Sequence, residues 1–490
     1  MKKLKLKTKP YSHQLKATKR AVKQGSHAFF FEPRLGKSKA ALDALAIQHF
    51  RGTVERVVIV APLIALDVWA NQIWEHLAVP ARVKVIGEPV WFSYPYHPRH
   101  KRSESLDRRD AHRRLKIFLL NYDKFSRRGE DEAYRNNYLR SVERWCPDAL
   151  IFDESHRVKS AGAVRSQALW RMVRRLRDRE DATHGRPFVY LLTGTPNPKG
   201  YLDLFSQFRI LDDSIFGTNK ADFEDRYCEY GIGKRRYTII RYRRKKEILR
   251  KVHEHASIAS AEGTGLANKQ LFNPIHITLP GKVRIAYGQL AEEFLTEISG
   301  RVLDAPNAGV RRMRLLQLTG GFTTDGTQIH HTKLQAARDF LVDLHEQGES
   351  VVVYSRFLPE VHALTELCKS IGYHTDTITG GVKRKHRTEA IATFQQARTP
   401  NALVFQSEAG SLAIELTAAA EEFFYSLPDS WETFYQCLKR VQGPKQKRPV
   451  RYTFLVARGT VDLSVLNTLR RKRDMHGEMM KQPRGFLYGL

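Results

Sequence analysis

The chain has 490 residues, and 42% of them are hydrophobic. This fraction is sufficient for globular packing, but the length exceeds what one compact core holds, so we expect two or three domains. The formal net charge is +30, from 82 basic and 52 acidic residues. An excess of this size attracts polyanions over long range and indicates nucleic acid as the partner. A solvated basic surface without a ligand is the alternative.

Cysteine usage and hydropathy bear on the compartment. The four cysteines, Cys146, Cys228, Cys368 and Cys437, are spread singly with no C-x-x-C pair, which argues against zinc and for a reducing compartment. The longest apolar stretch, residues 57–66, has about half the length of a membrane span. We therefore expect an intracellular, cytoplasmic protein with no membrane contact.

The first half of the chain alternates apolar segments with helical ones. Short apolar runs typical of buried parallel strands lie at 29–31, 57–60, 117–120, 149–152 and 188–192, and helices are expected at 37–50, 67–77, 165–177 and 201–208. This order predicts a doubly wound α/β sheet, in which ligands sit beyond the carboxyl ends of the strands.

A phosphate-binding loop is predicted between the first strand and the first of these helices. Residues 31–38 read FEPRLGKS, although Phe31 stands where the usual motif has a glycine. A loop of this kind offers backbone N–H groups and a lysine to the β- and γ-phosphates of a nucleotide. The motif alone also fits an ordinary turn. The candidate nucleotide-binding residues are Arg34, Leu35, Gly36, Lys37, Ser38 and Lys39.

The second half of a nucleotide-hydrolysing site follows the strand at 149–152. Residues 151–156 read IFDESH, so paired acids come directly after a buried strand. Asp153 and the Ser38 hydroxyl are the expected Mg²⁺ ligands, and Glu154 is expected to orient the attacking water and accept its proton. Lys37, Asp153 and Glu154 are therefore the candidate catalytic residues of an ATP hydrolase.

A second α/β series occupies the last third of the chain. Strands are expected at 350–354, 374–378, 402–405, 422–425 and 452–456, with helices at 359–371, 387–396 and 431–441. The region before it is polar, rich in Arg and Lys, and helical in pattern around 283–298 and 311–318. We expect an amino-terminal ATPase lobe at 1–250, a helical, basic insertion at 251–345, and a carboxyl-terminal lobe at 346–490.

Basic residues gather in several short clusters that are candidates for nucleic-acid contact. Some contain tyrosines, such as Tyr237 and Tyr242, which either stack on bases or simply pack. The clusters span residues 2–9, 99–114, 171–179, 234–251, 311–314, 439–451 and 470–473.

Taken in order, these segments resemble the superfamily-two helicase-like ATPases, and among them the Swi/Snf class of double-stranded DNA translocases. Compact members from phage and prokaryotic genomes are the best match, which places the protein in a bacterial or phage-infected cell. The matching segments are residues 10–14 (glutamine motif), 31–38 (motif I), 60–63 with 68–69 (Ia), 121–122, 153–159 (II), 192–196 (III), 354–357 (IV), 379–380 with 387 and 394, 407–417 (V) and 431–446 (VI).

The resemblance implies two RecA-like lobes and a role for each matching position. Gln14 would recognise adenine, although it also suits a helix cap, and Arg440 would act on the transferring phosphoryl group. Thr193 also suits ordinary turn chemistry. The positions implied to contact nucleic acid are Pro62, Asn121, Arg157, Lys159, Thr193, Arg356, Gly380 and Ser407.

Two motifs of the second lobe depart from the family pattern. In motif V, Ser411 and Ala413 replace glycines and Glu415 replaces an asparagine; in motif VI, Gly443 stands where the family has its arginine finger. A finger arginine is worth roughly 10³-fold in rate or more. Arg440, Lys445, Lys447 and Arg448 are the candidate substitutes.

These patterns predict an ATP- and Mg²⁺-dependent motor that grips duplex or branched DNA through its phosphates and moves along it as the lobes close and open. Two alternatives stay open: a nucleic-acid scaffold that binds ATP with little or no turnover, and a helicase whose track is RNA. Whether the chain also has a protein partner stays an open question.

Overall fold

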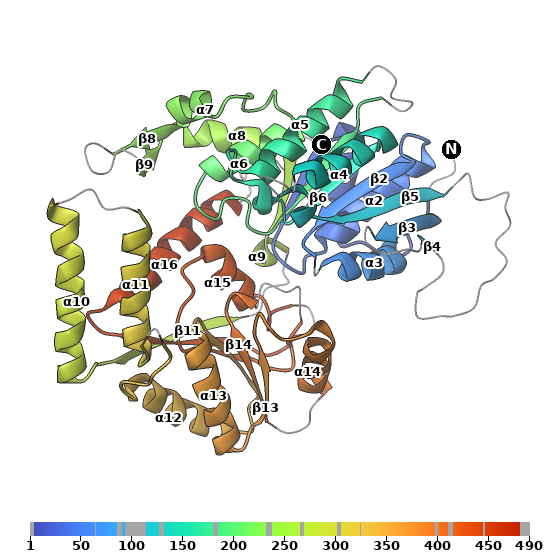
Figure 1. Ribbon diagram of the computed structural model, residues 1–490. Coiled ribbons are helices and arrows are strands. Elements are labelled where there is room, and N and C mark those ends of the chain that lie inside the picture. Colours follow the sequence, from blue (N-terminus) through green and yellow to red (C-terminus); the bar gives the residue numbers. More distant parts are fainter. Residues whose placement is uncertain are drawn as a thin grey trace. The chain divides into compact units, whose positions relative to one another are not determined.

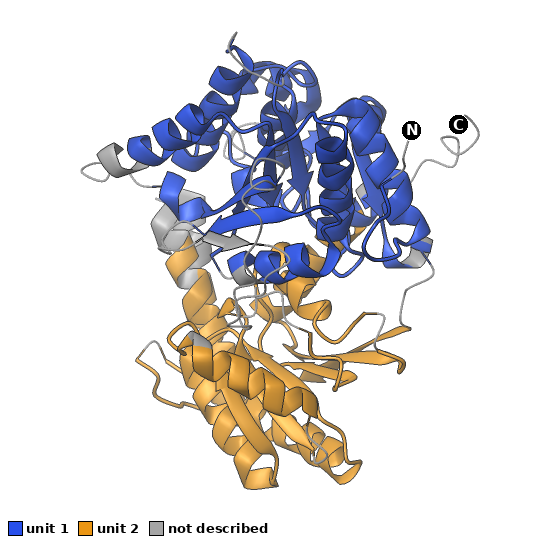
Figure 2. Cartoon of the chain, turned by 90° about the vertical axis from the view of Figure 1, so that its right-hand side faces the viewer, with its two compact units in different colours: residues 1–265, 475–490 blue, residues 266–474 orange. Residues whose placement is uncertain are grey.

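The structure, a computed structural model, divides into two compact units, residues 1–265 with 475–490 and residues 266–474 (Figure 2). It describes residues 4–63, 65–85, 91–93, 114–126, 132–179, 185–231, 238–264, 269–300, 305–323, 325–396, 400–409, 415–443 and 446–480. The basic cluster at 99–114 therefore lies almost wholly outside the described residues, as does the motif V segment 410–414.

Unit 1 is built on an eight-stranded sheet in which every pairing except β3–β4 is parallel (Figure 1). Strand β7, which ends at the predicted motif III, lies between β1 and β6, which precede the two halves of the predicted nucleotide site. In sheet order the strands are β10 (Ala256–Ala259), β1 (His27–Phe31), β7 (Phe188–Leu192), β6 (Ala149–Asp153), β2 (Arg56–Ala61), β5 (Leu115–Asn121), β3 (Ala81–Val85) and β4 (Trp91–Ser93).

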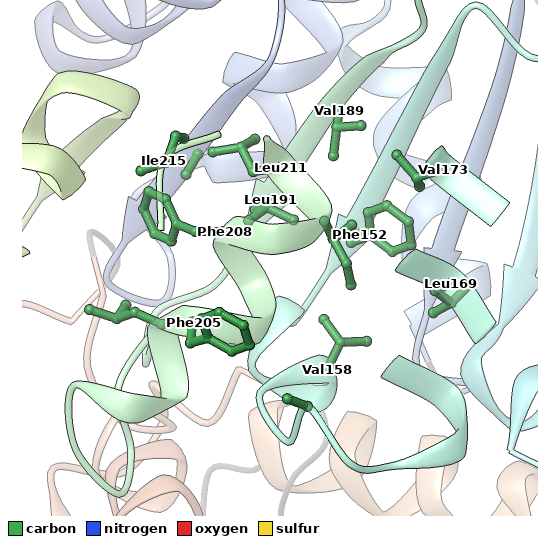
Figure 3. Packing of buried hydrophobic residues seen from close by; sticks show 14 of the residues in the cluster. Phe152, Val158, Leu169, Val173, Val189, Leu191, Phe205, Phe208, Leu211 and Ile215 are labelled. Atoms are coloured by element: carbon green, nitrogen blue, oxygen red, sulfur yellow. The ribbon is translucent and has the colours of Figure 1, made fainter. Parts of the chain in front are cut away.

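Successive side chains of the central strands pack on opposite faces of this sheet. Phe30, Phe152 and Leu191 join one cluster with residues of α5 (Val164–Arg177) and α6 (Leu202–Leu211), which Figure 3 shows from close by. Four further helices contact neighbouring helices or strands of unit 1. They are α1 (Ser12–Gln24), α2 (Lys37–Phe50), α3 (Ala65–His76) and α4 (Glu132–Trp145).

A small α/β segment follows α6 in unit 1. It consists of α7 (Lys220–Tyr227), the antiparallel pair β8 (Cys228–Tyr230) and β9 (Ile239–Tyr242), and α8 (Lys245–His255), before the chain returns to the sheet as β10. A short helix, α9 (Ala261–Thr264), comes last.

Unit 2 has an all-parallel six-stranded sheet with apolar clusters on both faces. Its strands, in sheet order, are β11 (Gln270–Ile277), β16 (Val450–Ala457), β15 (Glu421–Phe424), β12 (Val351–Ser355), β14 (Asn401–Gln406) and β13 (His374–Ile378). Its helices are α10 (Gly281–Gly300), α11 (Ala305–Gly320), α12 (Thr332–Glu346), α13 (Leu358–Ile371), α14 (Arg384–Gln396), α15 (Trp431–Leu438) and α16 (Val461–Met480), whose last turns belong to unit 1.

The predicted fold class of two RecA-like, doubly wound parallel sheets with helices inserted between them is confirmed. Each of the ten predicted strands is present within a few residues of its expected position. The sequence analysis missed β3, β4, β8, β9, β10 and β11. Among these, β10 reads ASIA, which has little strand-like character, and β11 contains Pro274, which an edge strand tolerates. Among the described residues, no helix combines the length and apolar character needed to cross a membrane.

The core of unit 1 yields a prediction about stability. Phe208 is fully buried among Phe30 and Phe216, with ring centroids 6.1 and 5.3 Å away, whereas Phe50 is 51% exposed. We expect Phe208→Ala to lower the free energy of unfolding by about 3–5 kcal/mol, because it removes a buried ring and leaves a cavity. The same change at Phe50 should cost under about 1 kcal/mol. Urea unfolding of both variants checks this, and similar losses would contradict the packing.

Candidate active site

The predicted phosphate loop curls between β1 and α2 through two residues with left-handed backbone. Arg34 has φ +70° and Gly36 has φ +76°. The first helical hydrogen bond of α2 runs from Ala40 N to Gly36 O over 3.1 Å, so the backbone N–H groups of Lys37, Ser38 and Lys39 lie at the helix N-terminus, where anions bind. The loop thus has the geometry of a phosphate cradle.

A glycine of the predicted motif III lets a second loop approach this one. A Cβ at Gly194 would lie 2.8 Å from Pro33 Cδ and 3.2 Å from Phe31 O. A side chain at that position would push the loop after β7 away from the phosphate loop. Gly194 is therefore required by the close approach of two backbones.

Gln14 holds α1 against the phosphate loop. Its amide nitrogen donates to Leu35 O over 3.0 Å, and its amide oxygen accepts from Tyr11 N over 3.0 Å at the start of α1. Gln14 therefore makes the helix-cap contact that was the alternative to adenine binding. Both functional groups of its amide are engaged within the loop and the helix, and adenine recognition stays a prediction.

Lys37 and Glu154 bring the two predicted halves of the site together. Lys37 Nζ lies 3.2 Å from Glu154 Oε1, and Glu154 occupies a left-handed position (φ +49°) at the turn after β6. Burial raises the pKa of Glu154, but the positive charge of Lys37 and the hydrogen bond to His156 outweigh it and hold the pKa well below its usual range. Glu154 is therefore a carboxylate at neutral pH, as a proton acceptor must be.

Asp153 is buried at the end of β6 and is held by three donors. Trp69 Nε1 donates to Oδ2 over 2.8 Å, the Glu154 backbone N–H donates to Oδ1 over 3.0 Å, and Tyr122 Oη donates to the Asp153 carbonyl over 2.8 Å. Burial and the neighbouring Glu154 charge raise the pKa of Asp153, whereas the Lys37 charge and the hydrogen bonds from Trp69 and the Glu154 backbone act in the opposite direction.

Sequence reasoning placed Trp69 and Tyr122 within motifs but assigned them no part in the site. Both side chains are buried, at 1% exposure. A buried Trp or Tyr needs a partner for its N–H or O–H, and this need was the signal that could have pointed to a nearby polar group. The sequence alone does not tell which one.

Thr193 and His156 connect the turn after β6 to the end of β7. His156 Nδ1 lies 2.9 Å from Thr193 Oγ1 and 3.3 Å from Glu154 Oε2, and Thr195 N donates to Thr193 Oγ1 over 3.0 Å. Thr193 is fully buried. Its hydroxyl is used inside the protein to hold the catalytic turn, and its contact with nucleic acid stays a prediction.

The side chain of Lys39 points away from the predicted nucleotide. Its Nζ lies 2.6 Å from Asp43 Oδ2 within α2, and both side chains are buried. At the phosphate loop Lys39 therefore offers its backbone N–H, and its contact with the nucleotide stays a prediction. Leu35 is buried and contributes its carbonyl to Gln14, whereas Ser38 is half-buried at the start of α2.

The other candidate nucleic-acid residues of unit 1 lie at the carboxyl ends of neighbouring strands. Pro62 follows β2 and Asn121 ends β5, where its side chain accepts from Lys124 N over 3.2 Å and caps a short turn of helix, Tyr122–Phe125. Arg157 is exposed after β6, and Lys159 is half-buried. The contact of these four residues with nucleic acid stays a prediction.

In unit 2, the three candidate nucleic-acid residues differ in their surroundings, and their contact with nucleic acid stays a prediction. Arg356 is paired with Asp429 at 2.5 Å, and only 12% of its side chain is exposed. Ser407 is fully buried, with its hydroxyl bonded to Ser355 O over 3.1 Å. Both side chains serve the interior of the unit, while Gly380 is exposed and its carbonyl accepts from Arg387 over 2.9 Å.

Arg440 does not occupy an exposed finger position. It is 8% exposed and lies near enough to Tyr354 and Cys437 to oppose the rise in pKa that burial causes at both groups. Arg440 therefore lies in the interior of unit 2, and its catalytic role stays a prediction.

The remaining substitutes for the finger differ in their surroundings. Arg448 Nη2 lies 2.5 Å from Glu349, Lys447 is exposed, and Lys445 lies outside the described residues. Gly443 has φ +141°, a backbone conformation that favours glycine. An arginine introduced at this position would strain the turn.

Gly36 and Gln14 provide a test of the loop geometry. A Cβ on Gly36 would lie 2.2 Å from Gln14 Nε2, whereas a Cβ on Gly52, which has a similar φ of +78°, meets nothing within 4 Å. We expect Gly36→Ala to lower the free energy of unfolding by about 1 kcal/mol more than Gly52→Ala, because it also displaces Gln14 from Leu35 O.

The matching control is Gly36→Ala combined with Gln14→Ala, compared with each single variant by denaturant unfolding. Removal of the Gln14 amide relieves the clash, so the two losses should not add. Additive losses would show that the two positions do not touch.

Comparisons with known proteins agree with this geometry. Residues 25–256 match the family described as "SNF2-related domain", and residues 332–442 match "Helicase conserved C-terminal domain". Together these matches cover more than half of the chain.

Individual relatives are distant in sequence. The chain is 23% identical over 476 residues to "Putative protein p41" of Acyrthosiphon pisum secondary endosymbiont phage 1, covering 91% of this chain and 93% of the relative. It is 26% identical over 346 residues to the mouse "DNA annealing helicase and endonuclease ZRANB3", covering 68% of this chain and 30% of the relative. A solved Sulfolobus solfataricus SWI2/SNF2 ATPase core in complex with dsDNA matches 98% of this chain and 94% of its own, at 15% identity and a TM-score of 0.41.

The chain spans nearly all of the phage relative but less than half the length of the animal and yeast relatives it matches. The resemblance to the Swi/Snf class is confirmed by the two family matches, which fall on the two units that carry the predicted motifs. The chain belongs to the SNF2-related, Swi/Snf-class branch of the superfamily-two helicase-like ATPases.

Proposed function

We propose that the chain is a Mg²⁺- and ATP-dependent motor that hydrolyses ATP when bound to duplex DNA and moves along the duplex. The observation that carries this proposal is the 3.2 Å pairing of Lys37 with Glu154 at the mouth of a phosphate cradle. A cation that can neutralise phosphate oxygens and a carboxylate that can accept a proton from water are thereby placed within reach of one γ-phosphate.

Each residue of the site has a distinct part in this reaction. The N-terminus of α2 and Lys37 bind the phosphates, and Lys37 exchanges its pairing with Glu154 for contact with the nucleotide. Glu154 then accepts the proton of the attacking water. His156 lies 3.3 Å from the second oxygen of Glu154 and fixes the direction in which the carboxylate points.

Ser38 and Asp153 would hold Mg²⁺, which neutralises charge on the phosphate oxygens. The donor set fits this ion, since it consists of a hydroxyl and a carboxylate at adjoining ends of α2 and β6, with phosphates and water left to complete the coordination. Trp69 and the Glu154 backbone N–H hold the two Asp153 oxygens and favour the charged form that binds a cation.

Duplex DNA is the proposed track because the chain carries a net charge of +30 and is related to a protein named as a DNA annealing helicase. Contacts with phosphates would give slight sequence preference and strong salt dependence. RNA as the track is the alternative, and competition between duplex DNA and duplex RNA for stimulating ATP turnover separates the two.

A second candidate function is an ATP-binding scaffold with little turnover. It is favoured by the interior position of Arg440 and by the left-handed glycine at position 443, where the family has its arginine finger. ATP binding without turnover at saturating DNA would support this scaffold over the motor.

The motor predicts different effects for two substitutions in the site. Glu154→Gln should retain ATP binding and lose about 10²-fold or more of DNA-stimulated turnover, because it removes the proton acceptor. Lys37→Ala should weaken ATP binding as well. Phosphate release with and without duplex DNA, together with fluorescent-nucleotide binding, measures both effects.

Matched controls for these variants are Glu75→Gln and Lys23→Ala, which change exposed side chains of unit 1 in the same way. Both should keep wild-type turnover. Equal turnover of Glu154→Gln and Glu75→Gln would refute the assigned role, and an identical wild-type rate with and without DNA would refute the DNA-dependent motor.

Trp69 allows the metal part of the proposal to be tested without measuring turnover. Trp69→Phe keeps an aromatic ring but removes the N–H that binds Asp153, so the charged carboxylate becomes less favourable in its buried position. We expect the Mg²⁺ concentration needed for half-maximal nucleotide binding to rise about tenfold, since a hydrogen bond to a charged group is worth roughly 1.5–3 kcal/mol.

Trp74→Phe is the control on the same helix, because Trp74 lies beside Lys7 instead of Asp153. Its Mg²⁺ requirement should equal that of the wild type. Because burial raises the pKa of Asp153 and protonation of Asp153 competes with the cation, the defect of Trp69→Phe should grow as the pH is lowered. A defect that does not vary with Mg²⁺ would show a purely structural role.

A further inference from the structure

A basic surface of unit 1 has no part in the site described above. We call it the hairpin surface and define it as residues 238–246, which include β9, the link Arg243–Arg244 and the first two residues of α8 (Figure 1). Its cations Arg241, Arg243, Arg244, Lys245 and Lys246 are all exposed. Five exposed cations thus occur within six consecutive residues.

Few carboxylates neutralise these cations. Between residues 238 and 251 the chain has seven basic residues and one acid, Glu247. Glu247 Oε1 accepts hydrogen bonds from Arg226 and the Tyr227 hydroxyl, both over 2.8 Å, and its Oε2 lies 3.9 Å from Arg244 Nη1. Glu229 lies 3.8 Å from Arg241. The mutual repulsion of the cations is therefore only partly offset within the protein, and a polyanion would relieve it.

The backbone that presents these cations is fixed. Arg243 donates from Nη2 to the carbonyls of Asp225 and Cys228, over 2.7 and 2.8 Å, and its backbone N–H donates to Tyr227 O over 2.8 Å. These bonds join α7, β8 and β9. A surface that is already ordered loses little conformational entropy on binding.

Tyr242 attaches the hairpin surface to the loop after β7. A Cβ on Gly200 would come within 2.3 Å of the Tyr242 hydroxyl oxygen. The same oxygen lies 3.4 Å from Leu202 N at the start of α6. The Tyr201 and Tyr242 rings meet edge to face at 5.2 Å. Glycine at position 200 is thus required for this attachment.

The same helix reaches the catalytic turn. Gln207 on α6 donates to Pro196 O over 2.6 Å and accepts from Ser155 Oγ over 2.8 Å. Ser155 directly follows Glu154. Buried contacts therefore run from the hairpin surface to the residue beside the proposed proton acceptor, all within unit 1.

We propose that the hairpin surface is a second contact for the phosphates of duplex DNA, separate from the loops after β2, β5 and β6. The cations are spread along a strand and a helix start and do not converge on one point, which suits an extended row of phosphates better than a small anion. This inference rests on the proposed function only in taking DNA as the track.

The test neutralises three exposed cations of the hairpin surface in one variant: Arg241→Gln, Lys245→Gln and Lys246→Gln. The control carries Lys16→Gln, Lys19→Gln and Lys23→Gln, three exposed lysines on α1 of the same unit. Both variants lose the same net charge. Affinity for a fluorescent duplex DNA is measured without nucleotide at several salt concentrations.

We expect the dissociation constant of the hairpin variant to rise about tenfold or more. The slope of log affinity against log salt should fall by up to about 2.7, at roughly 0.9 for each lost phosphate contact. The control should change affinity less than about threefold and leave the slope unchanged. ATP turnover without DNA should equal the wild-type value in both variants.

Equal losses in the two variants would overturn the proposal, since they would show only a general charge effect, and so would an unchanged affinity of the hairpin variant. A loss seen with duplex RNA but not with duplex DNA would overturn the assignment to DNA. DNA binding is measured without ATP and therefore does not depend on turnover. If the wild-type protein failed to hydrolyse ATP, the motor would be rejected, but the DNA-binding result would still test the hairpin surface.

Discussion

The ion pair between Lys37 and Glu154 is the contact on which the whole site depends. Lys37 begins α2 after β1, and Glu154 follows β6, two strands that are separated in the sheet by β7. Only the parallel arrangement of these strands brings both side chains to one edge. The glycine at position 194 then lets the loop after β7 approach the phosphate loop closely enough for the pair to form beside a cradle of N–H groups.

Around this pair, buried side chains from other loops fix the acids. Trp69 comes from α3, Tyr122 from the turn after β5, and Thr193 from the end of β7. Trp69 and Tyr122 form hydrogen bonds with Asp153, and Thr193 forms one with His156, near Glu154. In a buried setting these polar groups have few alternative partners. The turn after β5, which the family resemblance links to nucleic acid through Asn121, is thus in direct contact with the proposed metal ligand through Tyr122.

The sequence predicted the fold well because buried parallel strands are short, apolar and bounded by turn residues, as at β2 and β6. It also singled out Lys37 and Glu154, which the structure brings together, because the chemistry of a nucleotide site requires those residue types beside strand ends. A motif gives the position of a residue but not the direction of its side chain. Thr193, Arg356, Ser407 and Arg440 occupy motif positions, yet their side chains are engaged in the interior.

The account is tested most directly by a structure with Mg²⁺ and a non-hydrolysable ATP analogue. It predicts that Lys37 Nζ leaves Glu154 and contacts the β- and γ-phosphates, with Mg²⁺ between Ser38 and Asp153 and Glu154 facing the γ-phosphate. An intact Lys37–Glu154 pair, with the triphosphate bound elsewhere, would contradict it.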